Sequence, residues 1–178
     1  MERLLKNGNI VRDDIEHVYS GLFLAAFTAF EALIEDLFFG LLKGTITSKA
    51  NHRTVSIKPA ALSNLIVYGD RSYIDWLPYK EKTIARAKRF FKNGGIFSTL
   101  TKQQILQIRE YQVIRNALAH KSQIAQQNFQ KLISPLPLLP TEKTPSGYLR
   151  NVPNAAASQT QYEIMIIELQ FIANHLCK

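Results

Sequence analysis

The sequence predicts an all-α domain with two long helices, a C-terminal helix and short accessory helices. Apolar residues recur every three or four positions over three long segments, which is the spacing of a helix with a buried face. The chain has only 8 Gly and 7 Pro, few for an all-β fold with its many turns. Its 178 residues, 46% of them apolar, suit one compact domain. We therefore predict a single domain over residues 1–178, with a core from about 10 to 176.

The first long helix is predicted from Ile10 to about Lys43. Asp13 and Asp14 favour its N-terminal end through the helix dipole, and Gly44 marks its exit. One apolar stripe consists of Ile15, Val18, Leu22, Ala26, Phe30, Leu33, Leu37 and Leu41. A second stripe consists of Phe23, Phe27, Ile34 and Phe38. Because the two stripes cover much of the circumference, we expect this helix to be buried on most sides.

Shorter elements are expected in the middle of the chain. Residues 44–58 are polar and predict a long loop. A short helix is predicted from Ala60 to Tyr68, since the preceding proline is tolerated at the first helical position. A strongly basic helix is predicted from Glu81 to Phe91, and Asn93-Gly94-Gly95 then predicts a turn.

The second long helix is predicted to open at Thr101 and to persist to about His120. Thr101 and Gln104 match a capping box, in which two side chains satisfy free backbone N–H groups. Its apolar stripe consists of Ile105, Ile108, Tyr111, Ile114 and Leu118. A shorter helix is expected from Gln123 to Ile133.

The last third is predicted as a loop followed by a helix. Residues 134–157 contain several prolines and predict an extended loop. Ser158 and Gln161 match a second capping box, so the last helix is expected from about Gln159 to Leu176. Its apolar stripe consists of Tyr162, Met165, Leu169, Ile172 and Leu176.

The positive charge is concentrated in one part of the chain. The formal net charge is +8, and residues 71–131 alone hold twelve Lys or Arg against three Asp or Glu. Such a basic region is typical of proteins that bind a polyanion, usually RNA or DNA. It is equally consistent with a solvated basic face that keeps the protein soluble.

Several classes of protein are disfavoured. Cys177 is the one cysteine, so we expect no intrachain disulfide and no zinc site built from paired cysteines. A single cysteine also fits a reducing, cytoplasmic setting. No signal peptide is expected, and the most apolar stretch, Gly21–Phe30, is shorter than the roughly 20 residues that a bilayer requires. No phosphate-binding glycine motif or metalloprotease motif occurs, so we expect no membrane, metal or cofactor.

One stretch combines residue types that can do chemistry. His17, His52 and His175 each stand alone and are expected to be surface or loop residues. Arg109, Gln112, Asn116 and His120, in contrast, are spaced by three, four and four residues and share one helical stripe. Arg115 lies about 100° round the helix from Asn116, and its long side chain can reach the same edge.

These residue types suffice for metal-free cleavage of RNA. An imidazole such as that of His120 can transfer a proton near neutral pH, and a guanidinium such as that of Arg115 binds a phosphate and stabilises growing negative charge. One histidine cannot readily be acid and base in one step, but a symmetric dimer would supply two. The competing interpretation is a helix-terminal His120 stabilised by the helix dipole, with Arg115 in a salt bridge.

The surrounding sequence resembles the HEPN superfamily. Ile114-Arg115-Asn116-Ala117-Leu118-Ala119-His120 is similar to its R-x-x-x-x-H signature, in which Asn often follows Arg. Phe30-Glu31-Ala32-Leu33 is similar to the family's glutamate in an aromatic-rich early helix, and Gly95-Ile96-Phe97-Ser98 leads toward the motif helix. Pro145-x-Gly147-Tyr148-Leu149-Arg150 before a final helix resembles the RiboL-PSP-HEPN branch. The resemblance covers roughly residues 10–176.

The resemblance implies an antiparallel helical bundle that forms a homodimer with the motif helices at the interface. It implies a metal-independent endoribonuclease of the kind found in toxin–antitoxin, phage-defence or RNA-processing systems, and an inhibitory partner such as an antitoxin. Arg115 and His120 would be the catalytic pair, Asn116 the polar residue beside them, and Glu31 a supporting carboxylate. The superfamily also contains non-catalytic modules, so RNA or nucleotide binding without turnover, or dimerisation alone, are the alternatives.

The basic residues would steer the RNA backbone in the ribonuclease interpretation. This set comprises Lys82, Arg86, Lys88, Arg89, Lys92 and Arg109. Tyr79, Phe90 and Phe91 interleave with these charges and could stack on bases, but their helical spacing favours a place in the core.

Overall fold

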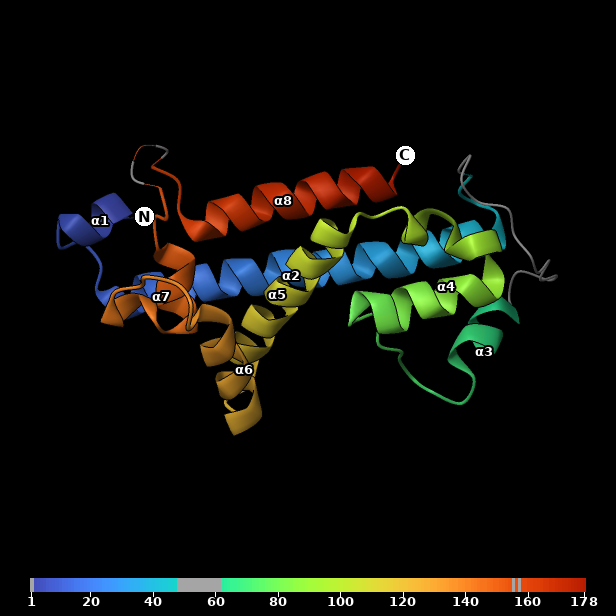
Figure 1. The fold of residues 1–178 in the computed structure, drawn as a ribbon, viewed down its shortest axis with the longest axis horizontal. Coiled ribbons are helices and arrows are strands. Elements are labelled where there is room, and N and C mark those ends of the chain that lie inside the picture. Colours follow the sequence, from blue (N-terminus) through green and yellow to red (C-terminus); the bar gives the residue numbers. More distant parts are fainter. Residues whose placement is uncertain (1, 48–61, 155, 157) are drawn as a thin grey trace. The chain divides into compact units, whose positions relative to one another are not determined.

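The computed structural model describes residues 2–47, 62–154, 156 and 158–178 (Figure 1). The helices in the first half are α1 (Glu2–Lys6), α2 (Arg12–Lys43), α3 (Leu62–Tyr68), the π-helical turn η1 (Tyr79–Ile84), α4 (Ala85–Phe90) and the 3-10 segment η2 (Lys92–Ser98). Those in the second half are α5 (Lys102–Ala119), α6 (Gln123–Ile133), the 3-10 turn η3 (Pro140–Glu142), α7 (Pro145–Arg150) and α8 (Gln161–Leu176). No β-strand occurs in the described ranges, so the all-α prediction is confirmed for them.

The chain divides into two compact units. The first comprises Met1–Thr28 and Glu110–Leu169, and the second comprises Ala29–Arg109 and Gln170–Lys178. The helices α2, α5 and α8 each contribute one part to the first unit and the other part to the second. The prediction of a single domain over residues 1–178 stays a prediction.

The first unit packs helices around the N-terminal part of α2. Tyr19 of α2 contacts Tyr162 of α8 edge to face, with ring centroids 5.5 Å apart. Phe23 and Phe27 stack one turn apart on α2, and both are fully buried. In Figure 1, α7 lies beside the start of α2, and α6 follows α5 through a short connection. The Tyr111 hydroxyl of α5 donates a hydrogen bond to the carboxylate of Glu168 on α8, which joins the helix that carries the Arg115–His120 motif to this unit.

The second unit is organised around an aromatic cluster on the C-terminal part of α2. Phe38 is fully buried and contacts four other rings at centroid distances of 5.0 to 5.7 Å. Those rings belong to Trp76, Phe90, Phe91 and Phe97. Aromatic rings of this size bury much apolar surface and prefer such tilted and edge-to-face arrangements.

The aromatic residues of the basic segment belong to this core. Tyr79 and Phe91 are buried, and the Tyr79 hydroxyl donates a hydrogen bond to the carbonyl of Phe97 at 3.1 Å. Burial raises the pKa of the Tyr79 phenol. Phe90 is half-buried against Phe38. The core interpretation of Tyr79 and Phe91 is therefore the correct one, since neither ring is available to stack on a base.

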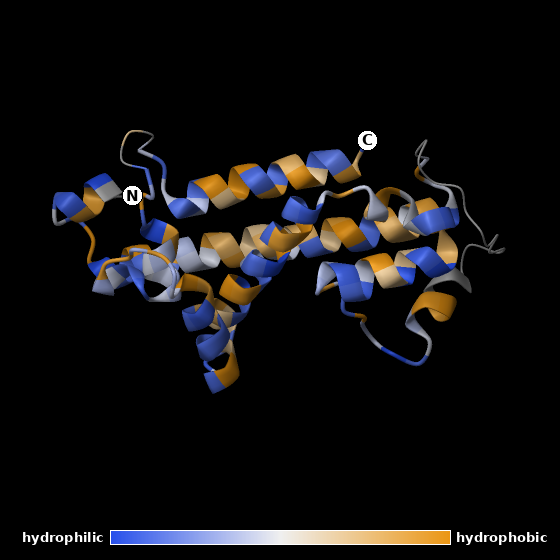
Figure 2. Cartoon of the chain, viewed as in Figure 1, coloured by the Kyte–Doolittle hydropathy of each residue, from blue (hydrophilic) through white to orange (hydrophobic). Residues whose placement is uncertain are grey.

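The long helices match the predicted segments closely. The buried face of α2 differs from the predicted apolar stripes at Leu22. On α2 the buried face includes Ile15, Tyr19, Phe23, Phe27, Phe30, Ile34 and Phe38. Leu22, which the sequence placed on the first buried stripe, is 48% exposed. On α8 the stripe Met165, Leu169, Ile172 and Leu176 is buried as predicted, and hydrophobic and hydrophilic residues alternate along it in Figure 2. The predicted loop at 48–58 and the start of the predicted Ala60–Tyr68 helix lie outside the described residues.

The predicted loop over residues 134–157 is wrong in part, because it contains η3 and α7. Thr144 caps α7 by accepting a hydrogen bond from the Gly147 N–H at 3.0 Å, and Pro145 occupies the first helical position. A side chain at Gly147 would collide with the carbonyl of Thr141, so this glycine permits close packing of η3 on α7.

The two predicted capping boxes have different outcomes. Thr101 and Gln104 form the expected reciprocal pair at the start of α5, with distances of 2.9 and 3.2 Å. The box predicted at Ser158 and Gln161 is wrong: Thr160 and Glu163 form it instead, two residues later. Ser158 has a positive φ of 51°, which is incompatible with the extended conformation of an N-cap residue.

Candidate functional site

The candidate site lies at the C-terminal end of α5. Tyr111, Ile114 and Ala117 are buried and fix the inner face of this part of the helix. Arg115 and Asn116, which flank this face, are half-buried. The sequence thus holds the motif on a helix that is anchored on one side and accessible on the other.

Arg115 and Asn116 are joined by a direct hydrogen bond. Nη1 of Arg115 donates to Oδ1 of Asn116 at 3.2 Å. Adjacent residues on a helix diverge by about 100°, so this bond turns the guanidinium toward the Asn116 side. The guanidinium of Arg115 therefore reaches the edge of the helix that carries Asn116, as expected from the length of the arginine side chain.

His120 follows the last residue of α5, and its side chain is exposed. The His120 N–H donates to the carbonyl of Asn116 at 2.9 Å, which closes the last helical turn. Gln126 of α6 donates from Nε2 to the carbonyl of Ala117 at 2.9 Å and to that of His120 at 3.4 Å. The backbone of His120 is therefore held, while its imidazole faces solvent.

A short connection after His120 leads directly into α6. Ser122 caps that helix by accepting a hydrogen bond from the Ala125 N–H at 3.3 Å. Because α5 ends at Ala119 and α6 begins at Gln123, only three residues lie between the two helices. The histidine therefore sits at a tight helical junction.

The combination of groups suits phosphate chemistry. A guanidinium and an amide lie side by side, and a solvent-facing imidazole follows within one helical turn. These groups can bind a phosphate oxygen and exchange a proton with a reacting oxygen. Among the residues that the structure describes, no cluster of three or more His, Cys, Asp or Glu side chains could hold a metal ion.

Two other predicted site residues belong to the second unit. Glu31 of α2 is half-buried, and Arg109 of α5 is exposed. Arg115, Asn116 and His120 belong to the first unit. The roles assigned to Glu31 and Arg109 stay predictions.

The predicted RNA-binding cations differ in their surroundings. Lys82, Lys88, Arg89 and Lys92 have exposed side chains. Arg86 instead lies over the ring of Trp76, 4.7 Å from its centroid, and Nη1 donates to the carbonyl of Asp75 at 3.0 Å. Burial, with the nearby charge of Arg89, lowers the pKa of the Arg86 guanidinium. Its contacts give Arg86 a structural role in its own unit.

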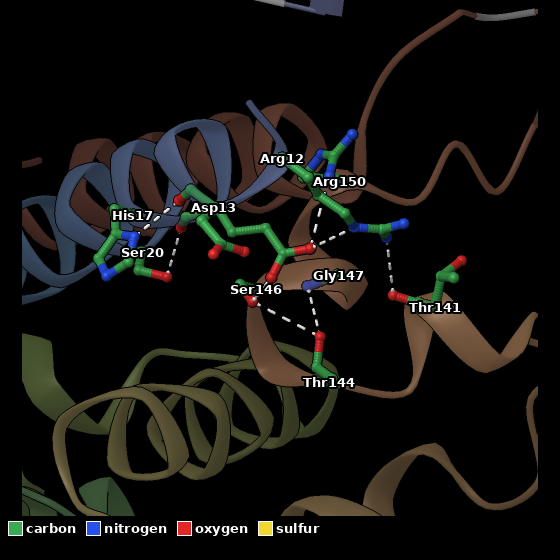
Figure 3. A network of polar contacts seen from close by, with 10 residues as sticks. Arg12, Asp13, His17, Ser20, Thr141, Thr144, Ser146, Gly147 and Arg150 are labelled. Carbon is green, nitrogen blue, oxygen red and sulfur yellow. Dashed lines mark hydrogen bonds and ion pairs between the residues drawn. The ribbon is translucent and has the colours of Figure 1, made fainter. Parts of the chain in front are cut away.

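A polar network that the sequence analysis did not predict surrounds Glu16 near the start of α2 (Figure 3). Arg12 Nε donates to Oε1 of Glu16 at 2.8 Å, and Arg12 Nη2 donates to the carbonyl of Thr141 at 3.3 Å. Ser146 Oγ donates to Oε2 of Glu16 at 2.9 Å, and Nη1 of Arg150 lies 3.5 Å from Oε1. The carboxylate thereby links α2 to α7, two helices that are far apart in the sequence.

Of the remaining histidines, His17 contacts its own helix and His175 contacts a residue far away in the sequence. His17 Nδ1 lies 2.6 Å from the carbonyl of Asp13, and His175 Nε2 lies 3.1 Å from Oγ1 of Thr99. His52 lies outside the described residues. The first two contacts agree with the expected surface or loop roles.

The chain has no significant match to a known protein family, to a characterised protein or to a solved structure. Within the described ranges, no helix has both the length and the apolar character that crossing a bilayer demands.

Proposed function

We propose that the chain is a metal-independent endoribonuclease of HEPN type that cleaves single-stranded RNA. The observation that carries this proposal is the end of α5, where Arg115 is hydrogen-bonded to Asn116 and His120 is exposed in the next turn. The resemblance of this segment to the R-x-x-x-x-H signature assigns the same residues. A ribonuclease of this kind would suit a toxin or defence component under the control of an inhibitory partner.

In the proposed reaction the 2′-hydroxyl of one nucleotide attacks the adjacent phosphorus. The bond to the 5′-oxygen of the next nucleotide breaks, which leaves a 2′,3′-cyclic phosphate and a free 5′-hydroxyl. Arg115 binds the scissile phosphate and stabilises the charge on the five-coordinate phosphorus species. Asn116 positions the guanidinium, and His120 transfers a proton to or from a reacting oxygen.

The proton balance of this reaction favours a dimer. The attacking hydroxyl loses a proton in the same step in which the leaving oxygen gains one. Two copies of the α5 end, facing each other in a symmetric homodimer, would supply a second imidazole. The exposure of His120 supports this arrangement, since its ring is accessible to a second chain.

The test is cleavage of a fluorescent single-stranded RNA in excess EDTA by the wild type and by His120→Ala. The substitution should lower the rate by about 10²- to 10⁴-fold, the usual contribution of a general acid or base. Arg115→Lys retains the charge but loses the planar pair of donors, so it should also be slowed. The wild-type product should end in a 2′,3′-cyclic phosphate.

Matched controls make the outcome decisive. His17→Ala removes a histidine that contacts its own helix, and it should cleave as the wild type does. Circular dichroism and thermal melting should show that every variant folds. Cleavage that survives in His120→Ala would refute the catalytic role, and RNA binding without any cleavage by the wild type would identify a non-catalytic module instead.

A further inference from the structure

The segment that joins α6 to η3 presents prolines and leucines to solvent. It belongs to the first unit and reads Ser134-Pro135-Leu136-Pro137-Leu138-Leu139-Pro140. The side chain of Leu139 is 63% exposed and that of Leu136 is 38% exposed, and the three prolines are exposed as well. Contiguous exposed apolar residues mark an interaction surface, whereas single ones are ordinary on a protein surface.

The order of these residues is that of a polyproline ligand. Two leucine–proline pairs, Leu136-Pro137 and Leu139-Pro140, are separated by Leu138 alone. A polyproline II helix repeats every three residues, so the two leucines lie on one edge, the two prolines on a second edge and Leu138 on the third. Pro-x-x-Pro segments in this conformation dock in grooves that are lined by aromatic side chains.

The exposure of the side chains follows the same repeat of three. Both leucine–proline pairs are exposed, whereas Leu138 between them is half-buried. The residue that is turned toward the rest of the chain is therefore the one on the third edge, which a groove does not need. The two edges that a groove binds are the ones that face solvent.

The backbone is extended at the second pair and bent at the first. Leu139 has φ of −65° and ψ of 154°, near the polyproline II values of about −75° and +145°. Each proline fixes its own φ near −65°, which suits the same helix. The Leu138 N–H donates to the carbonyl of Leu136 at 2.9 Å, and this hydrogen bond bends the chain at Pro137. Docking therefore straightens the chain at Pro137 and breaks that one hydrogen bond.

Both ends of the segment are held by the first unit. Ile133, the last residue of α6, is buried. On the other side, the Leu139 N–H donates to Oε2 of Glu142 at 2.8 Å. Nη2 of Arg12 donates to the carbonyl of Thr141 at 3.3 Å. Fixed ends and prolines lower the conformational entropy that docking has to remove, so they favour association.

A positive charge follows the segment. Lys143 has an exposed side chain, and Nε2 of Gln130 donates to its backbone carbonyl at 3.1 Å. The carboxylate of Glu142 is turned back onto the Leu139 N–H. An acidic residue beside a partner's groove would therefore meet the Lys143 ammonium, which fixes the direction in which the segment lies in the groove.

We propose that residues 136–140 dock in the aromatic-lined groove of a protein domain that recognises polyproline II helices. The two leucine–proline pairs fill neighbouring pockets of the groove, and Lys143 pairs with an acidic residue at its rim. Docking of this kind is independent of cleavage at His120, and binding alone measures it.

The test is a nuclear magnetic resonance titration of isotope-labelled SH3 and WW domains with the unlabelled chain. Both kinds of domain bind proline-rich segments in aromatic grooves. The wild-type chain should shift the amide resonances around the groove of at least one domain, with a dissociation constant below about 1 mM. Shifts elsewhere on the domains would report a different contact, so the position of the shifts identifies the groove.

Variants of the segment separate the two pairs from general stickiness. Leu136→Ala/Pro137→Ala and Leu139→Ala/Pro140→Ala each remove one pair, and each should weaken binding by about tenfold or more. Pro135→Ala is the matched control, because this proline is exposed in the same segment but lies outside both pairs. Lys143→Ala should weaken binding and reduce its dependence on salt. Circular dichroism should show that every variant folds.

Shifts at the groove that saturate with the wild type and with Pro135→Ala, and that are lost in both pair variants, would establish the docking surface. The proposal is overturned if no domain shows saturable shifts at its groove. It is equally overturned if either pair variant binds as tightly as the wild type, or if Pro135→Ala weakens binding as much as the pair variants do.

Discussion

Glu16 shows how a single side chain can connect elements distant in sequence. Burial by itself raises the pKa of this carboxyl group, because it disfavours the charged form. Hydrogen bonds from Arg12 and Ser146, with the positive charges of Arg12 and Arg150, outweigh burial, so the pKa is below its usual value. The ionised carboxylate is therefore the form that stabilises the folded chain.

The stability of the protein should consequently fall in acid. Because the pKa of Glu16 is lowered in the folded chain, its contribution to the free energy of unfolding is complete above about pH 4.5, the usual pKa of a glutamate. That contribution is lost as the pH falls through the pKa of the folded state. Glu16→Gln should remove this part of the pH dependence and cost roughly 1 kcal/mol at neutral pH. Urea unfolding of both proteins from pH 7 to pH 3 measures it.

Glu81→Gln is the matched control for this prediction. Glu81 is exposed, and no hydrogen bond or ion pair involves its side chain within the described part of the chain. Its substitution should leave the curve of unfolding free energy against pH nearly unchanged. Equal effects of the two substitutions would show that the network around Glu16 contributes nothing specific.

The residues of the α5 motif and those of the Glu16 network differ in how far the sequence predicts their contacts. Arg115, Asn116 and His120 are neighbours on one helix, so helical geometry alone predicts that they lie at one edge. Glu16 and Arg150 come together only because α7 packs on α2, and no local pattern encodes that contact. The hydrogen bond between Tyr79 and the carbonyl of Phe97 likewise depends on tertiary packing, because the two residues are far apart in the sequence.

At the scale of elements, the junction of α5 and α6 determines where the candidate site is placed. Carbonyl groups in the last turn of a helix have no partner within it and need one elsewhere. Gln126 satisfies those of Ala117 and His120 from the first turns of α6. The side chain of Gln126 thereby connects the two helices across the turn that carries His120.

Gln126→Ala should therefore destabilise the protein by about 1 kcal/mol, the usual net value of such a hydrogen bond. If the end of α5 is the catalytic centre, the variant should also cleave RNA more slowly. Gln127→Ala is the control, since Gln127 is exposed on the same helix and should be neutral. Denaturant unfolding and the RNA assay test the two effects, and identical behaviour of both variants would contradict them.

Helices with a clear apolar periodicity and an N-cap residue are predicted well from the sequence, and the short helix α7, which lacks this periodicity, is not. The helices at 102–119 and 123–133 carry clear periodicity and N-cap residues, so the sequence predicts them well. α7 has only six residues and includes a glycine, and it depends on Thr144 and on contacts with η3. At the start of α8 two overlapping segments match a capping box, and only the backbone conformation at Ser158 decides between them.

At the scale of the whole molecule, the charge distribution bears on RNA binding. The exposed cations Lys82, Lys88, Arg89 and Lys92 lie on η1, α4 and η2, all within the second unit. Long-range attraction by such a surface concentrates a polyanion near the protein and weakens as salt rises. A strand drawn to this unit needs no sequence-specific contact to remain bound.

The proposed dimer makes a quantitative prediction for mixtures of subunits. When wild-type and His120→Ala chains are mixed in equal amounts and allowed to exchange, random pairing in a symmetric dimer leaves about one quarter of the dimers fully wild type. If a composite site needs both imidazoles, RNA cleavage per total protein should fall to about one quarter of the wild-type value. If each chain acts alone, it should fall only to about one half. Sedimentation of the mixture confirms dimers, and native mass spectrometry confirms that the subunits exchange. An activity of one half in an exchanged dimer would show that a single His120 suffices.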